Sequence, residues 1–138
     1  TLNALLDKAL GADGYYGFFV ANMHSDTALS PGSDAIIAAA QARGVPVISS
    51  KQLLEWLEAR DASKFDDLKW DGSKITFSIA ADDAANGLRA MLPRQARGGT
   101  LSALTRDGAP VTFETKTIKG VEYAVFPADD GAYAATYS

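Results

Sequence analysis

A series of turn sequences at short, regular intervals constrains the second half of this chain more than any other feature. Residues with turn chemistry occur at 71–73, 82–87, 94–99, 106–108, 119–120 and 129–131. The segments between them alternate apolar and polar residues, as Ile75, Phe77 and Ile79 do. Such alternation is typical of strands with one buried face, and many short strands in succession indicate a sandwich. The pattern predicts an antiparallel β-sandwich of seven short strands over residues 65–138.

The later strands are expected where the same alternation returns. Its apolar or inward positions are Leu88, Ala90 and Leu92; Leu101, Ala103 and Thr105; Val111, Phe113 and Thr115; Val121, Tyr123 and Val125; and Tyr133, Ala135 and Tyr137. The dipeptide Asp107-Gly108 is a strong hairpin turn sequence.

The first half has a different pattern. Apolar residues at helical spacing predict helices over 2–10, 34–43 and 51–60, and apolar runs predict strands over 15–23 and 45–48. Ser33 is expected to cap the second helix. Leu53, Leu54, Trp56 and Leu57 are expected to form the buried face of the third helix.

Helices and strands in alternation indicate a parallel sheet, but two strands are too few to complete one. We therefore expect residues 1–64 to be the tail of a larger α/β domain or to borrow strands from elsewhere. The predicted fold class is α+β: a short α/β segment, helix-strand-helix-strand-helix, over 1–64, and the sandwich over 65–138.

Composition excludes several classes of function. The net charge is −4 and no Lys/Arg cluster stands out, so we expect no nucleic-acid partner. The longest apolar stretch, 15–23, is too short to span a bilayer, and no signal peptide is visible. The chain has no cysteine and a single histidine, which excludes disulfides, thiol nucleophiles and a multi-histidine metal site built from this chain alone. It begins at Thr1 rather than Met, so we expect a processed chain or a piece of a longer one.

His24 is the candidate catalytic residue. It follows the predicted strand over 15–23, and ligands of parallel α/β folds collect at the carboxyl ends of strands. Imidazole is also suited to acid–base chemistry near neutral pH. The alternative is a histidine that caps a loop or satisfies a backbone group. Asp26 could orient the imidazole, although we favour ordinary loop polarity for Ser25 and Asp26.

Two pairs of adjacent carboxylates raise the possibility of calcium binding or glycosidic acid–base chemistry. They are Asp66-Asp67 and Asp129-Asp130. Their spacing matches no calcium loop. We interpret both pairs as helix-end and turn residues.

The pattern Asp129-x-Gly131-x-Tyr133 resembles the tyrosine corner of immunoglobulin-like sandwiches, in which a tyrosine hydroxyl bonds back to the backbone. The predicted sandwich is therefore immunoglobulin-like. Ala135 stands where antibody domains have their second cysteine, so no disulfide is implied. We interpret Trp56 as a core residue and Trp70 as a residue that packs at the boundary between the halves.

Residues 17–60 resemble the closing part of a bacterial polysaccharide deacetylase (NodB-like) barrel. The segments that carry the resemblance are Val20-Ala21-Asn22-Met23-His24, Ala35-Ile36-Ile37-Ala38-Ala39-Ala40, Gly44-Val45-Pro46-Val47-Ile48 and Ser50-Lys51-Gln52-Leu53-Leu54-Glu55-Trp56. Met23-His24 is similar to the family's late leucine-x-histidine motif, with Asn22 in place of the leucine.

The resemblance implies that His24 assists deacetylation as a general acid beside a metal site. The family's aspartates and metal-binding histidines would lie upstream, so no cofactor is expected in this fragment and a divalent metal is expected only in the full-length protein. The expected partners are the upstream domain and a polysaccharide, and the expected location is extracellular or periplasmic.

Three hypotheses of function follow. The first is the C-terminal fragment of a larger exported carbohydrate-active hydrolase, not catalytically complete by itself. The second is a non-catalytic module that binds glycan or packs against a neighbouring domain. The third is a stand-alone α+β domain that completes its sheet by dimerising.

Overall fold

A computed structural model of the 138-residue chain describes residues 1–12, 14, 17–22 and 29–138. The helices in these residues are α1 (Leu2–Leu10), α2 (Pro31–Gln41) and α3 (Ser50–Ala62). The strands are β1 (Lys64–Trp70), β2 (Lys74–Ala80), β3 (Arg89–Pro93), β4 (Gln95–Ala96), β5 (Gly99–Arg106), β6 (Ala109–Pro110), β7 (Glu114–Ile118), β8 (Val121–Pro127) and β9 (Gly131–Tyr137). The chain divides into two compact units, Thr1–Ser49 and Ser50–Ser138. We call the second the sandwich unit.

The first unit contains α1 and α2, with Leu6 and Ala40 buried. Arg43 Nε donates a 2.7 Å hydrogen bond to Asp7 Oδ1. This bond lowers the pKa of the Asp7 carboxyl. α2 begins at Pro31, and the backbone N–H of Ser33 donates to the Ser30 hydroxyl oxygen. The cap is therefore Ser30 rather than Ser33, because proline with its fixed φ suits the first helical position.

The two strands expected in the first half do not form in the described residues. Residues 17–22 and 45–48 have no strand assignment. Val20 is 83% exposed, and Val47 and Ile48 are also exposed. A strand needs a partner for its backbone groups, and these apolar runs have none in the described part of the chain. The prediction of a parallel sheet is wrong for these residues.

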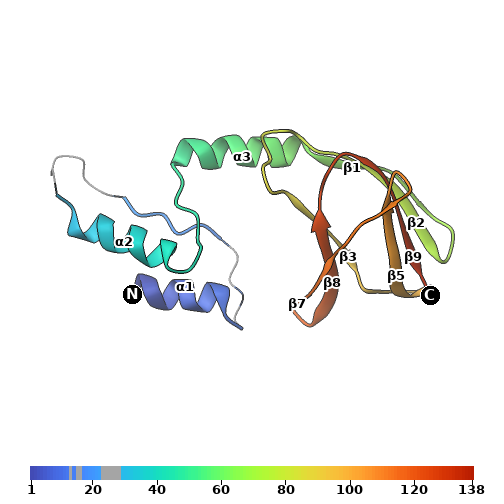
Figure 1. The fold of residues 1–138 in the computed structure, drawn as a ribbon, viewed down its shortest axis with the longest axis horizontal. Coiled ribbons are helices and arrows are strands. Elements are labelled where there is room, and N and C mark those ends of the chain that lie inside the picture. The colour runs from blue at the N-terminus through green and yellow to red at the C-terminus, as the bar shows by residue number, and fades with distance from the viewer. Residues whose placement is uncertain (13, 15–16, 23–28) are drawn as a thin grey trace. The chain divides into compact units, whose positions relative to one another are not determined.

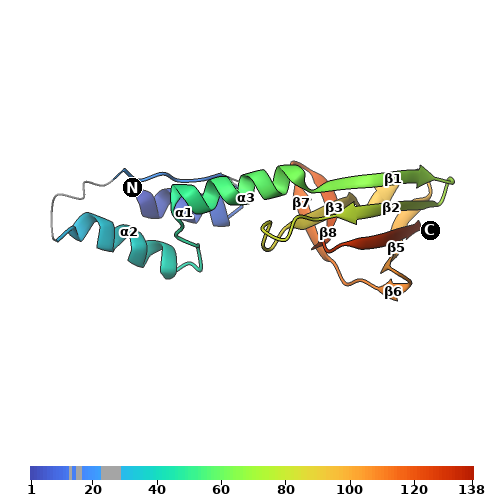
Figure 2. The ribbon, with the colours of Figure 1, turned by 90° about the horizontal axis from the view of Figure 1, so that it is seen from above.

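The sandwich unit has two antiparallel sheets, as the turn spacing predicts, so the chain is α+β with a sandwich-like arrangement of strands. Among the described residues, the larger sheet has six strands in the order β1-β2-β9-β5-β4, with β6 paired to β5, and the smaller has the order β3-β8-β7. Figures 1 and 2 show β2, β9 and β5 side by side in one layer, with β3 and β8 in the other.

The core lies between these two sheets. Its buried residues are Phe77, Ile79, Ala90, Leu101, Leu104, Ala124, Phe126, Ala128, Tyr133, Ala135 and Tyr137. The predicted alternation holds in β2 and β9. In β8 the core face holds Ala124 and Phe126 instead of Val121 and Tyr123, because a shift of one residue turns every side chain of a strand to the other face.

Two irregularities change the predicted strands further. In β5 the register shifts between Leu101 and Ala103, so Leu104 is buried and Ala103 is exposed. The strand expected over 111–115 begins later, as β7 at Glu114, because the chain crosses from one sheet to the other over 111–113. β6 pairs with β5, and β7 pairs with β8.

Helix α3 belongs to the sandwich unit. Trp56 Nε1 donates a 3.0 Å hydrogen bond to the Asn86 carbonyl oxygen, and the backbone N–H of Asp82 donates to Ser63 Oγ at 2.9 Å. The boundary between the two compact units therefore lies before α3, between Ser49 and Ser50, whereas the sequence predicts a domain boundary between residues 64 and 65. The boundary between domains stays a prediction. The predicted buried face of α3 is partly wrong, since Leu54 and Leu57 are exposed.

Candidate functional site

The candidate catalytic residue, His24, lies outside the described residues, as do Ser25 and Asp26. Its role therefore stays a prediction. The positional argument for it is weakened, because the described residues ahead of it, 17–22, form no strand that would place it at a strand end.

The two carboxylate pairs have structural partners. Asp66 forms a 3.1 Å ion pair with Lys64, and Asp67 has a φ of +55° where the register of β1 shifts. Asp129 forms an ion pair with Arg106, and Asp130 Oδ1 accepts a hydrogen bond from the backbone N–H of Ala81. The turn interpretation is confirmed for Asp129-Asp130. Asp66-Asp67 lies at a β-bulge rather than at a helix end.

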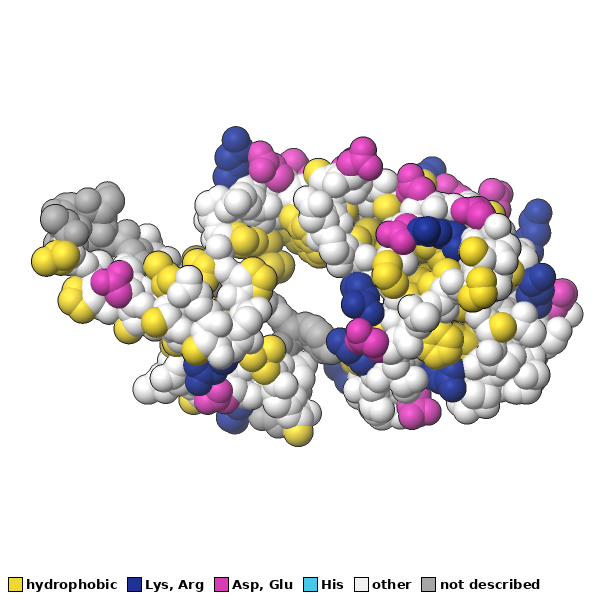
Figure 3. All heavy atoms as spheres, viewed as in Figure 1, with side chains coloured by type: hydrophobic (Ala, Val, Ile, Leu, Met, Phe, Trp, Pro, Cys, Tyr) yellow, Lys and Arg dark blue, Asp and Glu magenta, His cyan; other side chains and the backbone are white. Residues whose placement is uncertain are grey.

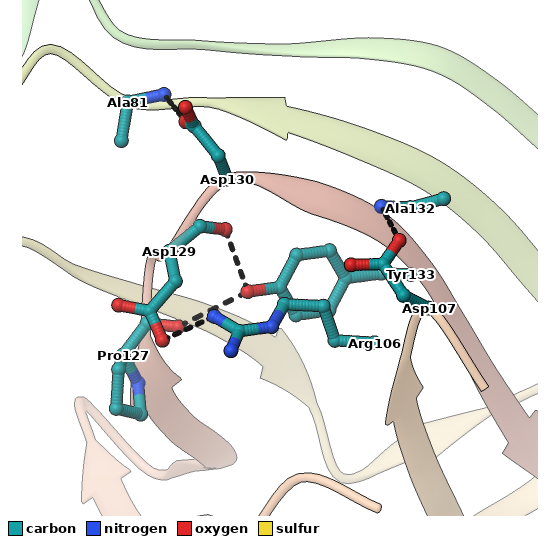
Figure 4. Close-up of polar contacts among 8 residues, drawn as sticks. All are labelled: Ala81, Arg106, Asp107, Pro127, Asp129, Asp130, Ala132 and Tyr133. Carbon is teal, nitrogen blue, oxygen red and sulfur yellow. Dashed lines mark hydrogen bonds and ion pairs between the residues drawn. The ribbon is translucent and has the colours of Figure 1, made fainter. Parts of the chain in front are cut away.

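Tyr133 forms the corner that the sequence predicts. Its hydroxyl donates to the backbone carbonyl oxygen of Asp129 at 2.8 Å, and its ring is 2% exposed. Figure 4 shows Arg106 reaching past the Tyr133 ring to the Asp129 carboxylate. Burial raises the pKa of the Tyr133 hydroxyl, and the nearby guanidinium acts in the opposite direction. These hydrogen bonds and the ion pair stabilise the fold at this corner.

The described residues contain no cluster of three or more His, Asp or Glu side chains that could hold a metal ion. Neither carboxylate pair therefore offers a metal site with its described neighbours.

An uncovered strip of the inner face is the strongest candidate for binding. β1 is the edge strand of the larger sheet and β3 is the edge strand of the smaller one. Phe65 pairs with Ile79 and Trp70 pairs with Ile75, so both aromatic residues of β1 share the inner face with core residues. Phe65 is nevertheless 46% exposed and Trp70 is 44% exposed. We call the strip between β1 and β3 the seam. Phe65 and Trp70 are its exposed residues, and its floor is formed by the half-buried Ile75 and Leu88 and the buried Ile79 and Ala90.

Both aromatic rings of the seam rest on rings of the core. The Trp70 ring meets the Tyr137 ring edge to face, with centroids 5.7 Å apart, and the Tyr137 hydroxyl donates to the Pro93 carbonyl oxygen at 3.0 Å. The Phe65 ring lies 5.5 Å from the Phe77 ring. Each exposed ring therefore has one side braced and another side open to a ligand.

A cavity of about 240 Å³ opens at the Phe65 end of the seam. Phe65, Ile79 and Leu88 line it together with the charged residues Arg60 and Arg89. Figure 3 shows hydrophobic side chains (yellow) uncovered between the two layers of the sandwich unit, with Lys and Arg side chains (dark blue) beside them. An apolar floor with polar groups at its rim is typical of small-molecule and glycan sites.

Sequence reasoning missed most of the seam. Phe65 marks only a change of pattern in the sequence, and Arg60 is one of several charged residues on a helix. Two exposed aromatic residues on one strand are a usable indication, but the β1 bulge between Asp66 and Lys69 hides it. Without the bulge, Phe65 and Trp70, five residues apart, would point to opposite faces. The ring contact of Trp70 is with Tyr137 of the same unit, and Trp56, expected in the core, is only half-buried.

Two further findings concern the whole chain. No helix in the described ranges has the length and apolar character that a membrane span requires. No protein-family model, curated protein or solved structure matches this chain.

Proposed function

We propose that the sandwich unit is a non-catalytic module that binds a glycan chain along the seam, as part of a larger, exported polysaccharide deacetylase-like hydrolase. The observation that carries the proposal is the half-exposed Trp70 ring, held edge to face by the buried Tyr137. An indole held in this way loses little conformational entropy on binding and offers a flat apolar surface beside water.

The shape of the seam supports an elongated ligand. Phe65 and Trp70 are five residues apart on one edge strand, a separation of roughly 15 Å at the usual rise per residue. Both rings belong to the same inner face, so one extended chain can contact both. A sugar ring has an apolar face and polar edges, and an aromatic ring beside solvent complements both.

The exposed apolar residues of the first unit favour a second role within the same proposal. Among its described residues, Val20, Leu29 and Val47 are each more than half exposed. Large apolar side chains left this exposed can be covered by another part of a protein. We propose that it packs against the catalytic domain, and that His24 belongs to that domain's active site.

Affinity electrophoresis in gels that contain glycol chitin, xylan or hydroxyethylcellulose tests the binding role. We expect at least one polymer to retard the full chain and Trp70→Ala to abolish the retardation, with Trp70→Phe intermediate because a ring remains. Met91→Ala is the matched control, because Met91 is as exposed as Trp70 but is not part of the seam. If no polymer retards the chain, or if Trp70→Ala and Met91→Ala behave alike, the glycan role is wrong.

The fragment role has a separate assay. We expect this chain alone to release no acetate from an acetylated chitin oligosaccharide, with or without added divalent metal. Metal-dependent deacetylation by the chain alone would contradict the proposal that this chain is catalytically incomplete.

A further inference from the structure

Cationic residues outnumber acidic ones around the cavity at the Phe65 end of the seam. At the Phe65 end, the cavity of about 240 Å³ is lined by Arg60, Lys64 and Arg89 and by one acid, Asp61. The chain as a whole has a net charge of −4, so a local excess of cations stands against the general composition. Cations around an apolar floor favour a ligand that has both an anionic group and an apolar face.

The three cationic residues at the cavity differ in whether they already form an ion pair within the chain. Lys64 pairs with Asp66 at 3.1 Å. The Arg89 guanidinium pairs with Glu114 at 3.5 Å and donates to the Val125 carbonyl oxygen at 3.2 Å, so it lies over the outer face of the smaller sheet and away from the seam. Arg60 forms no ion pair with any residue that the structure describes. Its guanidinium is therefore the cation most available to a ligand at this end of the seam.

We propose that the glycan bound along the seam is acidic, with a sugar carboxylate at Arg60 and the adjoining ring on Phe65. This inference rests on the proposed function of the seam. A planar guanidinium matches a carboxylate with two parallel hydrogen bonds, which a neutral sugar cannot provide. The negative net charge of the chain repels polyanions in general, so affinity for an acidic glycan requires a local site of this kind.

The experiment compares two polymers that share a backbone and differ in charge. Polygalacturonate carries a carboxylate on each sugar, and fully methyl-esterified polygalacturonate carries none. Titration calorimetry of the full chain with each polymer is expected to show at least about tenfold tighter binding of the acid form, the size expected for a charge-assisted hydrogen bond near a surface. Raising the salt concentration from 0.05 to 0.5 M is expected to reduce this preference.

Variants locate the site. We expect Arg60→Gln to remove most of the preference for the acid form and to leave binding of the ester unchanged. Arg60→Lys provides a second variant, which keeps the charge at the end of α3 but not the planar fork, and it is expected to lose part of the preference. Lys119→Gln is the matched control. Lys119 lies in the turn between β7 and β8, and β7 is the strand at the opposite edge of the smaller sheet from β3. Thermal midpoints check that each variant is folded.

The outcomes separate this inference from the proposed function. If the chain binds both polymers equally and Arg60→Gln changes neither affinity, the preference for acid is wrong while glycan binding at the seam stands. If Lys119→Gln weakens binding of the acid form as much as Arg60→Gln, the attraction is general and the site assignment is overturned. If the chain binds neither polymer and no neutral glycan retards it, both proposals fail.

Discussion

The hydroxyl of Tyr133 donates a 2.8 Å hydrogen bond to the backbone carbonyl oxygen of Asp129, four residues earlier in the chain. β8 belongs to the smaller sheet and β9 to the larger, so this bond closes the corner at which the chain passes between the two layers. Arg106, from β5, pairs with the Asp129 carboxylate at the same corner. Tyr133 and Arg106 therefore both fix Asp129 at the corner where the chain passes from one sheet to the other.

Replacing Tyr133 by phenylalanine removes the corner bond and keeps the buried ring. We expect Tyr133→Phe to lower the free energy of unfolding by about 1–2 kcal/mol, because the Asp129 carbonyl loses its partner in a partly buried position. Urea denaturation followed by circular dichroism measures the loss. Tyr123→Phe is the control, since no hydrogen bond of that hydroxyl occurs within the described residues. Equal losses in the two variants would mean that the corner bond contributes nothing.

The sequence predicts this corner because the pattern is local. Asp129, Gly131 and Tyr133 lie within five residues of one another, and their geometry depends little on the rest of the chain. The strands of the sandwich unit are predictable for a similar reason, since turn residues and alternation are both read over a few positions. Such patterns locate strands reliably, but they do not give the pairing between them.

The inward face of each strand is harder to predict. β8 has apolar residues on both faces. An inward face made of Val121, Tyr123 and Val125 therefore fits the sequence as well as one made of Ala124 and Phe126. In the folded chain, Ala124 and Phe126 are the residues of β8 that pack against the larger sheet. The β1 bulge between Asp66 and Lys69 puts Phe65 and Trp70 on one face, and no glycine or proline in the sequence indicates it. The seam therefore became visible only in three dimensions.

Gly131 provides a second test of the corner. Its φ is +144°, and an added Cβ would lie 2.6 Å from Asp107 Oδ2 and 2.9 Å from Arg106 Cγ. We expect Gly131→Ala to lower the free energy of unfolding by about 2 kcal/mol or more, since strain and steric overlap act together. Gly120, with a φ of +81° and nothing within 4 Å, is the matched position for strain alone. Gly120→Ala is expected to cost about 1 kcal/mol, and a cost equal to that of Gly131→Ala would argue against a crowded corner.

The first half shows the opposite limit of sequence reasoning. The run that includes Phe18, Phe19 and Val20 has the composition of a buried strand, yet these residues are exposed and form no strand. An apolar composition favours a buried strand only where neighbouring strands are present to pair with it, and no strand of the described residues does so. Helices α1 and α2 are predictable without partners because their hydrogen bonds are internal.

The position of α3 leads to a prediction about where the chain can be cut. A fragment of residues 50–138 keeps the hydrogen bond from Trp56 to Asn86 and that from Asp82 to Ser63, whereas a fragment of 65–138 loses both. We expect the longer fragment to melt at least about 5 °C higher, because each bond contributes about 1 kcal/mol. Scanning calorimetry measures both midpoints. Trp56→Phe in the longer fragment isolates the indole bond, and equal midpoints for the two fragments would support the boundary between 64 and 65.

The turn between β1 and β2 gives a prediction about pH. Asp71 Oδ1 accepts hydrogen bonds from the backbone N–H groups of Ser73 at 3.0 Å and Lys74 at 2.8 Å, and these bonds lower the pKa of the Asp71 carboxyl from 3.8. Because the folded state lowers this pKa, the ionised carboxylate stabilises the fold above about pH 4, and that contribution is lost as the pH falls through the folded value. We therefore expect Asp71→Ala to be less stable than the natural chain at pH 6, and the difference to shrink as the pH falls below about 4. Urea midpoints measured from pH 2.5 to 7 follow the difference. Asp71→Asn keeps an acceptor oxygen without a titrating group, so it should lose less stability than Asp71→Ala at pH 6, and its difference from the natural chain should shrink over the same pH range. If the difference between Asp71→Ala and the natural chain stays constant over this range, the carboxylate charge does not stabilise the turn.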